Sequence, residues 1–484
     1  MPTDPYNPEF FRRAGHQIVD DLANYLESAL AGALPVISLA APSELAREYQ
    51  DPIPLDAAPD AGAEVSRCLG QILRESIHLH HPGYVGHQVP PPLPLAALGD
   101  LISSLLNNSA AVFEMGPAGT AIERQVIRWL CAAVGWDSAS DGVLTAGGSL
   151  GNLTALLAAR NHATQGSAWL EGLHAGPPLV LLVSDQAHYS LARAAAILGL
   201  GQDSVITIPT DSRFRTDLTA LPDLYRRSVE EGKQVMAVVG TAGTTATGSY
   251  DPLREIGEFC GEKGIWFHVD GAHGASALFS EKYRSLADGI ELASSVVWDM
   301  HKMLFAPSLA TAVLFRRRED NYGAFSQEAN YLFARRPEEA DFDLALRTVE
   351  CTKRTSGIML WLALRVHGVQ AIGEMLTRTF DLARAFANLV KMQPDFELAT
   401  EPQSNILCFR HLPPSLNDPA QLDAHQRQVR RKVVAGGRYF LVQTVLRGKV
   451  YLRTTLMNPR TTIGDLEGLL AAIRTAASSL PAGP

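Results

Sequence analysis

The sequence predicts an α/β protein with a mainly parallel central sheet, an N-terminal helical extension and a C-terminal α+β domain. Short apolar runs alternate with amphipathic helical segments through the middle of the chain, which is typical of βαβ units. A helical segment precedes these units, and short strands mixed with helices follow them. At 484 residues the chain is too long for one ordinary core. We therefore expect parts at residues 1–80, 81–375 and 376–484.

The middle part contains apolar runs of strand length. Each run is short, and a loop or a helical segment separates it from the next. The predicted strands cover residues 142–144, 179–184, 205–208, 234–239, 265–269 and 295–298. Helices between strands at this spacing favour a parallel sheet with helices on both faces.

The two ends of the chain follow other patterns. Residues 8–30 predict a helix with an apolar face, formed by Phe11, Ile18, Leu22, Tyr25 and Leu26. The Pro- and Ala-rich residues 34–59 predict an extended connection. After two helices at 357–365 and 370–391, an α+β domain is predicted from strands at 406–410, 440–446 and 450–455 and helices at 421–435 and 463–478.

Composition argues against several classes of protein. The formal charge of −9 gives no excess of Lys and Arg, so we expect no nucleic-acid partner. No apolar run reaches the roughly 18 residues that span a bilayer, and the first residues lack a signal-peptide pattern. We expect no membrane partner. Five scattered cysteines indicate reduced thiols in a cytoplasmic protein. Because His78, His80 and His81 have no nearby Cys or HExxH pattern, we expect no metal.

Residues 264–302 carry the strongest chemical signal. Asp270 and Lys302 each follow a predicted strand, and the carboxyl ends of parallel strands meet at one edge of a sheet. Lys302 stands between apolar residues, where its charged form is disfavoured and its amine can attack a carbonyl. A solvated surface charge is the plain alternative. An aldehyde cofactor with a pyridine nitrogen would form a Schiff base with Lys302 and need an acid such as Asp270.

A Gly-rich turn follows the first predicted strand. Gly147, Gly148 and Ser149 open a helix, whose first N–H groups lack internal partners and whose dipole favours an anion. The glycines leave room for a phosphate, to which Ser149 can donate. The turn matches neither GxGxxG nor the P-loop, which argues against dinucleotides and nucleoside triphosphates.

Two segments carry a resemblance to a known family. HVDGAHG at residues 268–274 and WDMHKM at residues 298–303 resemble the cofactor-binding segments of the group II amino-acid decarboxylases, which use pyridoxal 5′-phosphate (PLP). That family includes aromatic-L-amino-acid, glutamate, cysteine-sulfinate and diaminobutyrate decarboxylases. The resemblance covers nearly the whole chain and implies a fold-type-I PLP enzyme that converts an L-amino acid to an amine and CO₂. It also implies a homodimer with the active site at the interface, where the N-terminal segment wraps the partner.

The resemblance implies roles for particular residues. Lys302 would hold PLP, Asp270 would protonate the pyridine nitrogen, and His188 would stack on the ring. Further cofactor contacts are expected from Gly148, Ser149, Thr244, Thr245, Ala272, Asp299 and His301. Substrate contacts are expected from Tyr84, His87, Gln88 and Arg453. The arginine would bind the α-carboxylate, a task that suits its planar fork.

One departure from the family leaves the product open. The family keeps a mobile catalytic loop after Phe315, and many aromatic-amino-acid decarboxylases carry on it a tyrosine that protonates the carbanion. The corresponding residues 343–344, ahead of Lys353 and Arg354, include no tyrosine, and Tyr322 and Tyr331 lie further upstream. We favour an amine product. The alternatives are oxidative deamination to an aldehyde, transamination, and a catalytically silent homologue that binds PLP.

Overall fold

The computed structural model describes residues 4–173, 176–325 and 341–480. The chain divides into two compact units: one contains Met1–His87, Ala385–Ala399 and Cys408–Pro484, and the other contains Gln88–Arg384 and Thr400–Leu407. Much of the predicted catalytic loop, with Tyr331, lies outside the described residues. The division into three domains stays a prediction.

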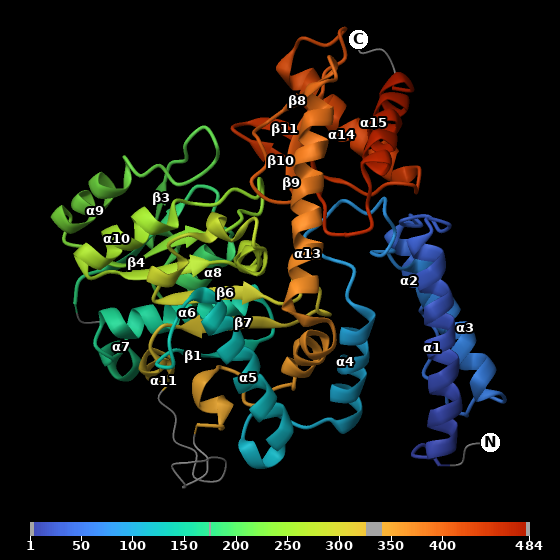
Figure 1. Cartoon of the computed structure of the whole chain (residues 1–484), viewed down its shortest axis with the longest axis horizontal. Helices are drawn as coiled ribbons and strands as arrows, with labels where there is room; N and C mark the ends of the chain where they lie inside the picture. The colour runs from blue at the N-terminus through green and yellow to red at the C-terminus, as the bar shows by residue number, and fades with distance from the viewer. Residues whose placement is uncertain (1–3, 174–175, 326–340, 481–484) are drawn as a thin grey trace. The chain divides into compact units, whose positions relative to one another are not determined.

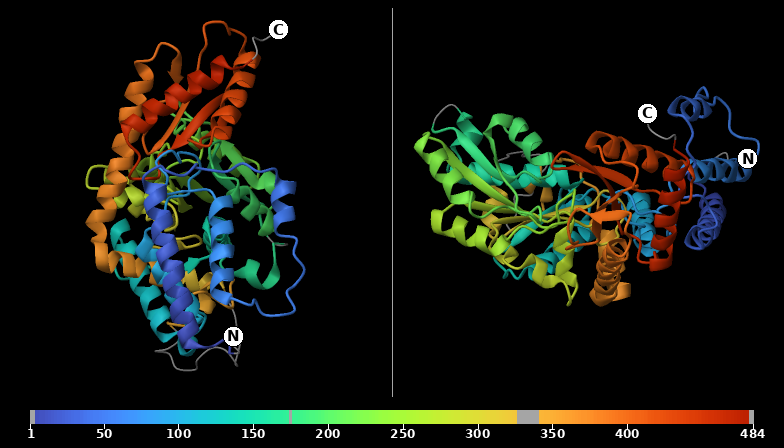
Figure 2. Two further views of the ribbon diagram at one scale, coloured as in Figure 1. Left: turned by 90° about the vertical axis from the view of Figure 1, so that its right-hand side faces the viewer. Right: turned by 90° about the horizontal axis from the view of Figure 1, so that it is seen from above.

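The second unit is built around a seven-stranded sheet of order β1-β7-β6-β5-β4-β2-β3 (Figures 1 and 2). The neighbouring pairs β3/β2, β2/β4, β4/β5 and β5/β6 are parallel, so the predicted α/β fold is confirmed. The strands are β1 (Asp141–Thr145), β2 (Leu179–Ser184), β3 (Val205–Ile208), β4 (Gln234–Thr241), β5 (Trp266–Asp270), β6 (Ser295–Asp299) and β7 (Thr311–Phe315).

Strand β7 is antiparallel to both of its neighbours, and the sequence did not predict it. It lies between β1 and β6, and Thr311 is opposite Thr145 on one side and Asp299 on the other. Since β1 and β6 both run opposite to β7, they run in the same direction. The carboxyl ends of β1, β2, β4, β5 and β6 therefore meet at one edge of the sheet, where α/β proteins bind ligands.

Helices cover both faces of this sheet. Helix α6 contacts β1 and β4–β7 on one face, and α9 and α10 contact β2–β5 on the other (Figure 1). The helices are α4 (Pro94–Leu106), α5 (Pro117–Val134), α6 (Gly148–Ala163), α7 (Ser167–Glu171), α8 (Ser190–Ile197), α9 (Leu221–Glu230), α10 (Leu253–Lys263), α11 (Arg318–Ala324) and α13 (Gly357–Lys391). Short 3₁₀ turns are η1 (Phe113–Met115), η2 (Gln202–Ser204), η3 (Gly274–Phe279), η4 (Arg284–Ala287), η5 (Ile290–Leu292) and η6 (Leu344–Arg347).

Helix α13 consists of two helical stretches, which agrees with the two helices predicted at 357–365 and 370–391. Gly368 interrupts it with a φ of 76°, a conformation that glycine adopts without steric cost. The predicted gap between the two helices therefore corresponds to this break.

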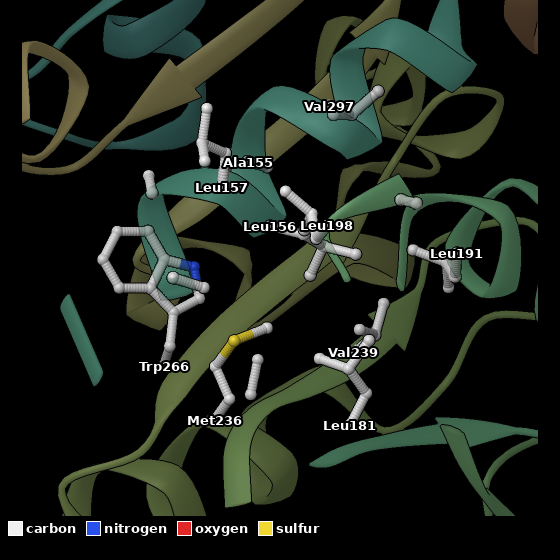
Figure 3. Close-up of a cluster of buried hydrophobic side chains, with 14 of the residues drawn as sticks. Ala155, Leu156, Leu157, Leu181, Leu191, Leu198, Met236, Val239, Trp266 and Val297 are labelled. Atoms are coloured by element: carbon white, nitrogen blue, oxygen red, sulfur yellow. The ribbon is translucent and has the colours of Figure 1, made fainter. Parts of the chain in front are cut away.

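The core of the second unit lies between α6 and the sheet. Leu156 of α6 packs in one buried cluster with Leu181 of β2, Met236 of β4 and Trp266 of β5 (Figure 3). Residues 154–159 of α6 are all buried, as expected for a helix that is covered around its circumference. This packing fixes the N-terminus of α6 at the edge of the sheet where the predicted site lies.

The first unit combines N-terminal helices with a four-stranded sheet of order β10-β11-β9-β8. The pairs β10/β11 and β8/β9 are antiparallel, which agrees with the predicted α+β composition. The strands are β8 (Phe396–Leu398), β9 (Ile406–His411), β10 (Val442–Leu446) and β11 (Lys449–Thr455). The helices are α1 (Pro8–Leu30), α2 (Pro42–Glu48), α3 (Ala61–Glu75), α14 (Pro419–Ala435) and α15 (Ile463–Ser478).

Helix α1 begins at a side-chain cap and leaves much of its apolar face uncovered. Oδ1 of Asn7 accepts the backbone N–H groups of Glu9 and Phe10 at 2.9 and 3.1 Å. Phe11 is 50% exposed and Leu22 is 40% exposed. Within the described ranges, no helix is long and apolar enough to cross a membrane. The same residues contain no group of three or more His, Cys, Asp or Glu side chains placed to hold a metal.

Candidate active site

Most of the predicted cofactor residues meet at the carboxyl edge of the seven-stranded sheet. They come from the ends of β5 and β6 and from the segments that follow β1, β2, β4, β5 and β6. Together they line a cavity of about 160 Å³ within the second unit. Its lining residues are Gly148, Ser149, Asn152, His188, Thr241, Gly243, Thr245, Asp270, Ala272, His273, Asp299, His301 and Lys302.

An acid holds the amine of Lys302. Nζ of Lys302 lies 2.9 Å from Oδ2 of Asp299, the last residue of β6. The hydroxyl of Thr311 on β7 donates to the other oxygen of Asp299. Burial opposes ionisation of Asp299, but the charges of Lys302 and His301 and the Thr311 hydrogen bond together lower the pKa of this carboxyl. A charged Asp299 thus positions the Lys302 amine at the cavity.

Asp270 lies at the end of β5 and is 5% exposed. Nδ2 of Asn152 donates to one of its oxygens at 3.0 Å, and the backbone N–H of Ala272 donates to the other at 3.2 Å. Both partners are donors, which suits the acceptor oxygens of a carboxylate. A charged acid in this place can hold a proton on a pyridine nitrogen.

His188 lies just after β2, and Ser190 engages one side of its ring. Nδ1 of His188 is 2.8 Å from Oγ of Ser190 and accepts the Ser190 backbone N–H at 3.3 Å. Burial lowers the pKa of His188, and the charge of Asp270 opposes this only in part. The imidazole is therefore mainly neutral at pH 7.

The turn between β1 and α6 leaves the end of the cavity open. Gly147 has a φ of 115° and Gly148 begins α6, so the first N–H groups of the helix have no partner inside it. A Cβ on Gly148 would lie 3.1 Å from both carboxylate oxygens of Asp299. A larger residue at this position would therefore press on the carboxylate that holds Lys302.

Four lining residues were not singled out from the sequence: Asn152, Thr241, Gly243 and His273. Asn152 could have been found from helical periodicity, because it lies one turn after Gly148. Thr241 ends β4, and its buried Oγ1 has no hydrogen-bond partner in the described part of the chain. Such an atom fits a ligand with a polar group.

Thr244 is not among the residues that line the cavity. It is fully buried, its hydroxyl is 2.9 Å from that of Thr247, and its oxygen accepts the backbone N–H of Ser249 at 3.1 Å. Its hydrogen bonds therefore stabilise the turn after β4, and Thr245 lines the cavity from that turn.

Three of the predicted substrate residues gather in the first unit, and Gln88 begins the second. The ring of Tyr84 stacks on Phe440 with 5.6 Å between centroids, and His87 is tilted against the same ring at 5.7 Å. Burial raises the pKa of Tyr84 to about 12. Burial also lowers the pKa of His87, and the charges of Arg453 and Arg430 add to this effect.

Arg453 is a buried cation on β11. It is 8% exposed, and its Nη2 donates to Oγ1 of Thr455 at 3.1 Å. Among the described residues, its Nε has no hydrogen-bond partner, and no carboxylate is among the groups that act on its charge. A buried guanidinium without a carboxylate provides a binding place for an anion.

Comparison with known families shows which family the chain belongs to. The model described as "Pyridoxal-dependent decarboxylase conserved domain" matches residues 56–412. The chain belongs to this family. The resemblance inferred from HVDGAHG and WDMHKM is thereby confirmed, and this decarboxylase uses PLP.

The decarboxylase is similar to bacterial and mammalian enzymes over most of its length. It is 32% identical over 438 residues to L-2,4-diaminobutyrate decarboxylase of Rhizobium meliloti, covering 88% of this chain and 85% of that one. It is 36% identical over 354 residues to cysteine sulfinic acid decarboxylase of Mus musculus, covering 71% and 70%. The crystal structure of mouse CSAD matches it with a TM-score of 0.90 and 29% identity, over 99% of this chain and 100% of that one.

The cavity residues of this decarboxylase fit PLP. The amine of Lys302 matches its aldehyde, the carboxylate of Asp270 matches its pyridine nitrogen, and the N-terminus of α6 matches its phosphate. The hydroxyl of Thr241, which has no hydrogen-bond partner among the described residues, could donate to an oxygen of such a ligand.

Proposed function

We propose that this enzyme removes CO₂ from an L-amino acid with a short acidic side chain and releases the corresponding amine. The observation that carries the assignment as a PLP-dependent decarboxylase is the presence of the Lys302 amine and the Asp270 carboxylate in one cavity. When bound, PLP supplies a ring that accepts the electron pair left by the departing CO₂. The residues around the cavity bind, orient and hold protons.

The proposed catalytic roles belong to Lys302, Asp270 and His188. Nζ of Lys302 would hold the cofactor through its aldehyde. The charged Asp270, supported by Asn152, holds a proton on the pyridine nitrogen. His188 and Ala272, which both line the cavity, would hold the two faces of the ring.

The remaining cavity residues bind the cofactor periphery. Gly148, Ser149 and His301 bind the phosphate, which is supported by their position around the N-terminus of α6 and the cavity. Asp299 orients Lys302, and Thr245 contacts the ring or its substituents.

Arg453 binds the α-carboxylate of the substrate in this proposal. Its burial without a carboxylate partner among the described residues supports the assignment. Tyr84, His87 and Gln88 contact the substrate side chain. The acidic side chain is supported by the charges that act on His87, which come from Arg453 and Arg430. Two positive charges that act on a residue assigned to the substrate side chain favour an anionic group there.

The names of the relatives point to two kinds of short polar side chain. Cysteine sulfinic acid carries an anion, and 2,4-diaminobutyrate carries a cation. The purified holoenzyme should therefore be incubated with cysteine sulfinate, aspartate, glutamate, 2,4-diaminobutyrate and the aromatic amino acids. We expect CO₂ and amine, measured by mass spectrometry, to form fastest from an acidic substrate. Faster turnover of diaminobutyrate or an aromatic amino acid would overturn the acidic preference, and the Lys302→Ala variant serves as the inactive control.

We also infer a homodimer that works in the cytoplasm. The exposed apolar side chains of Phe11 and Leu22 on α1 and of Leu105 on α4 support the dimer, because such faces are typical of subunit contacts. The five free cysteines support a reducing compartment. Sedimentation at assay concentration tests the dimer, and an active monomer would contradict it.

A further inference from the structure

A continuous set of buried hydrogen bonds links the two sides of the cavity. Asn152 stands at its centre and is 2% exposed. Its Nδ2 contacts Oδ2 of Asp270 at 3.0 Å and Oγ of Ser190 at 2.9 Å, and its Oδ1 lies 3.0 Å from Nε2 of His268. The chain of bonds continues from Ser190 to His188 in one direction and from His268 into β6 in the other.

The carboxylate of Asp270 determines which atoms of Asn152 donate and which accept. A charged carboxylate only accepts hydrogen bonds, so the Asn152 atom beside it has to be the amide nitrogen. The second hydrogen of that nitrogen is directed to Oγ of Ser190. The amide oxygen of Asn152 is then left to accept from Nε2 of His268.

The indole of Trp266 independently determines which nitrogen of His268 carries the proton. Its Nε1 is a donor only, and it lies 2.9 Å from Oγ of Ser295. The hydroxyl hydrogen of Ser295 is thus available to Nδ1 of His268, 2.9 Å away. His268 then carries its single proton on Nε2, which agrees with the requirement from Asn152. Burial lowers the pKa of His268 to about 4 and so favours this neutral form at pH 7.

Ser190 connects the amide of Asn152 to Nδ1 of His188. Because Oγ of Ser190 accepts from Asn152, its own hydrogen is free to donate to Nδ1 of His188 at 2.8 Å. The backbone N–H of Ser190 donates to the same nitrogen at 3.3 Å. Two donors on Nδ1 leave no place for a proton there. Ser190 is 1% exposed, so water does not replace these partners.

We propose that Asn152 is a positioning residue that, through Ser190, holds His188 as the neutral tautomer with its proton on Nε2. One amide hydrogen of Asn152 is donated to the carboxylate of Asp270. The other is donated to Ser190 and so fixes the tautomer of His188. His188 presents a hydrogen-bond donor at the cavity and withholds the lone pair that a general base would need. This last consequence rests on the proposed function, whereas the tautomer itself does not.

The tautomer can be measured directly in the holoenzyme. In protein labelled with ¹⁵N-histidine, long-range ¹H–¹⁵N correlations distinguish a protonated ring nitrogen from a bare one. The His188 signals are identified by their loss in His188→Gln. At pH 7 we expect a protonated Nε2 and a bare Nδ1. A proton on Nδ1, or an imidazolium, would overturn the proposal whatever the enzyme's substrate proves to be.

Variants test the path through Ser190 and Asn152. Ser190→Ala removes the hydroxyl donor, and Asn152→Leu removes the amide that orders it. In both variants we expect the His188 signals to move toward an average of the two tautomers. Asn161→Leu is the matched control, because Asn161 is also buried on α6 but its amide donates to the carbonyl of Gly323 at 2.9 Å. A His188 tautomer that is unchanged in Ser190→Ala and Asn152→Leu would contradict the positioning role.

Discussion

Lys353 and Glu123 form an ion pair in the interior of the second unit, where their side chains are 3% and 1% exposed. The same oxygen of Glu123 accepts the backbone N–H of Leu144 at 2.8 Å. The pair therefore joins the segment around Lys353 to α5 and to β1, just ahead of the Gly-rich turn. Burial lowers the pKa of Lys353, although the charge of Glu123 opposes that shift.

Removing one charge of this pair should destabilise the protein strongly. We expect Lys353→Met to lower the free energy of unfolding by roughly 3–5 kcal/mol, because the carboxylate of Glu123 would stay buried without an opposite charge. The double variant Glu123→Gln/Lys353→Met should recover much of this loss. Urea denaturation followed by fluorescence measures the difference. The neighbouring Arg354→Met is the matched control.

The control differs from Lys353 in exposure. The side chain of Arg354 is 54% exposed and pairs with Asp100 at 3.0 Å, and surface pairs of this kind contribute about 0–1 kcal/mol. Equal losses in Lys353→Met and Arg354→Met would show that the interior pair has no special role.

Lys302 should carry the cofactor. We expect the purified protein to be yellow, and borohydride to abolish the visible band and fix a pyridoxyl group on Lys302, as read by peptide mapping. The reason is that the carboxylate of Asp299 holds the Lys302 amine at the cavity. Nζ of Lys302 lies 2.9 Å from Oδ2 of Asp299. Lys282→Ala, which removes an exposed lysine paired with Asp381, should be labelled like the wild type. A pyridoxyl group on any other lysine contradicts the assignment.

Asp270→Asn should retain PLP and lose most activity. The neutral amide cannot hold the pyridine proton, so the ring accepts electrons less well, and we expect kcat to fall by roughly 10²–10³-fold. The visible spectrum checks that the cofactor is bound, and CO₂ release gives kcat. Turnover close to that of the wild type would rule out the role given to Asp270.

The residues that sequence analysis found and those it missed differ for a physical reason. Asp270 and Lys302 follow apolar strands, and a local pattern reveals them. Strand β7 was missed because it follows β6 without a helical crossover, so the alternation of strands and helices does not mark it. Its Thr311 nevertheless donates to Asp299 and helps to position Lys302.

Partners distant in sequence explain most of the remaining differences. The sequence placed Lys353 next to Arg354, in a basic pair that follows the predicted catalytic loop. Its contact with Glu123 depends on the fold, because the two residues are far apart in the chain. Asn152 has a predictable place on α6, but its bonds to Asp270 and His268 depend on the packing of α6 across β5. Thr244 differs for a local reason: its hydroxyl turns toward Thr247 in the same turn, whereas the sequence indicated only a small polar residue after a strand.

Two stacked histidines in the first unit should make stability depend on pH. Nδ1 of His411 and Nε2 of His425 are 2.9 Å apart. Burial, with His411 adding to it, lowers the pKa of His425 to about 4. Burial also lowers the pKa of His411, although Asp395 opposes the shift while Arg474 adds to it. The unfolded chain then binds more protons than the folded one between pH 6.5 and about 4, so stability falls as the pH falls through this window.

Thermal unfolding at pH 7 and pH 5 checks this dependence. We expect His425→Gln to remove part of the acid-side loss, on the order of 1–3 kcal/mol. His367→Gln, at an exposed position on α13, should behave like the wild type. The same fall in melting temperature in all three proteins would show that other groups set the pH dependence.

The product of the reaction depends on whether a proton or O₂ reaches the carbanion first. Tyr322 is held by Asp341, whose carboxylate accepts its hydroxyl at 3.2 Å, and Tyr331 lies outside the described residues. We expect the wild type in aerated buffer to form amine and CO₂ in equal amounts, with little ammonia or peroxide. If Tyr331 supplies the proton, Tyr331→Phe should raise peroxide and ammonia relative to CO₂, whereas Tyr322→Phe should not. Peroxide equal to CO₂ in the wild type would make the enzyme an aldehyde synthase and overturn the amine assignment.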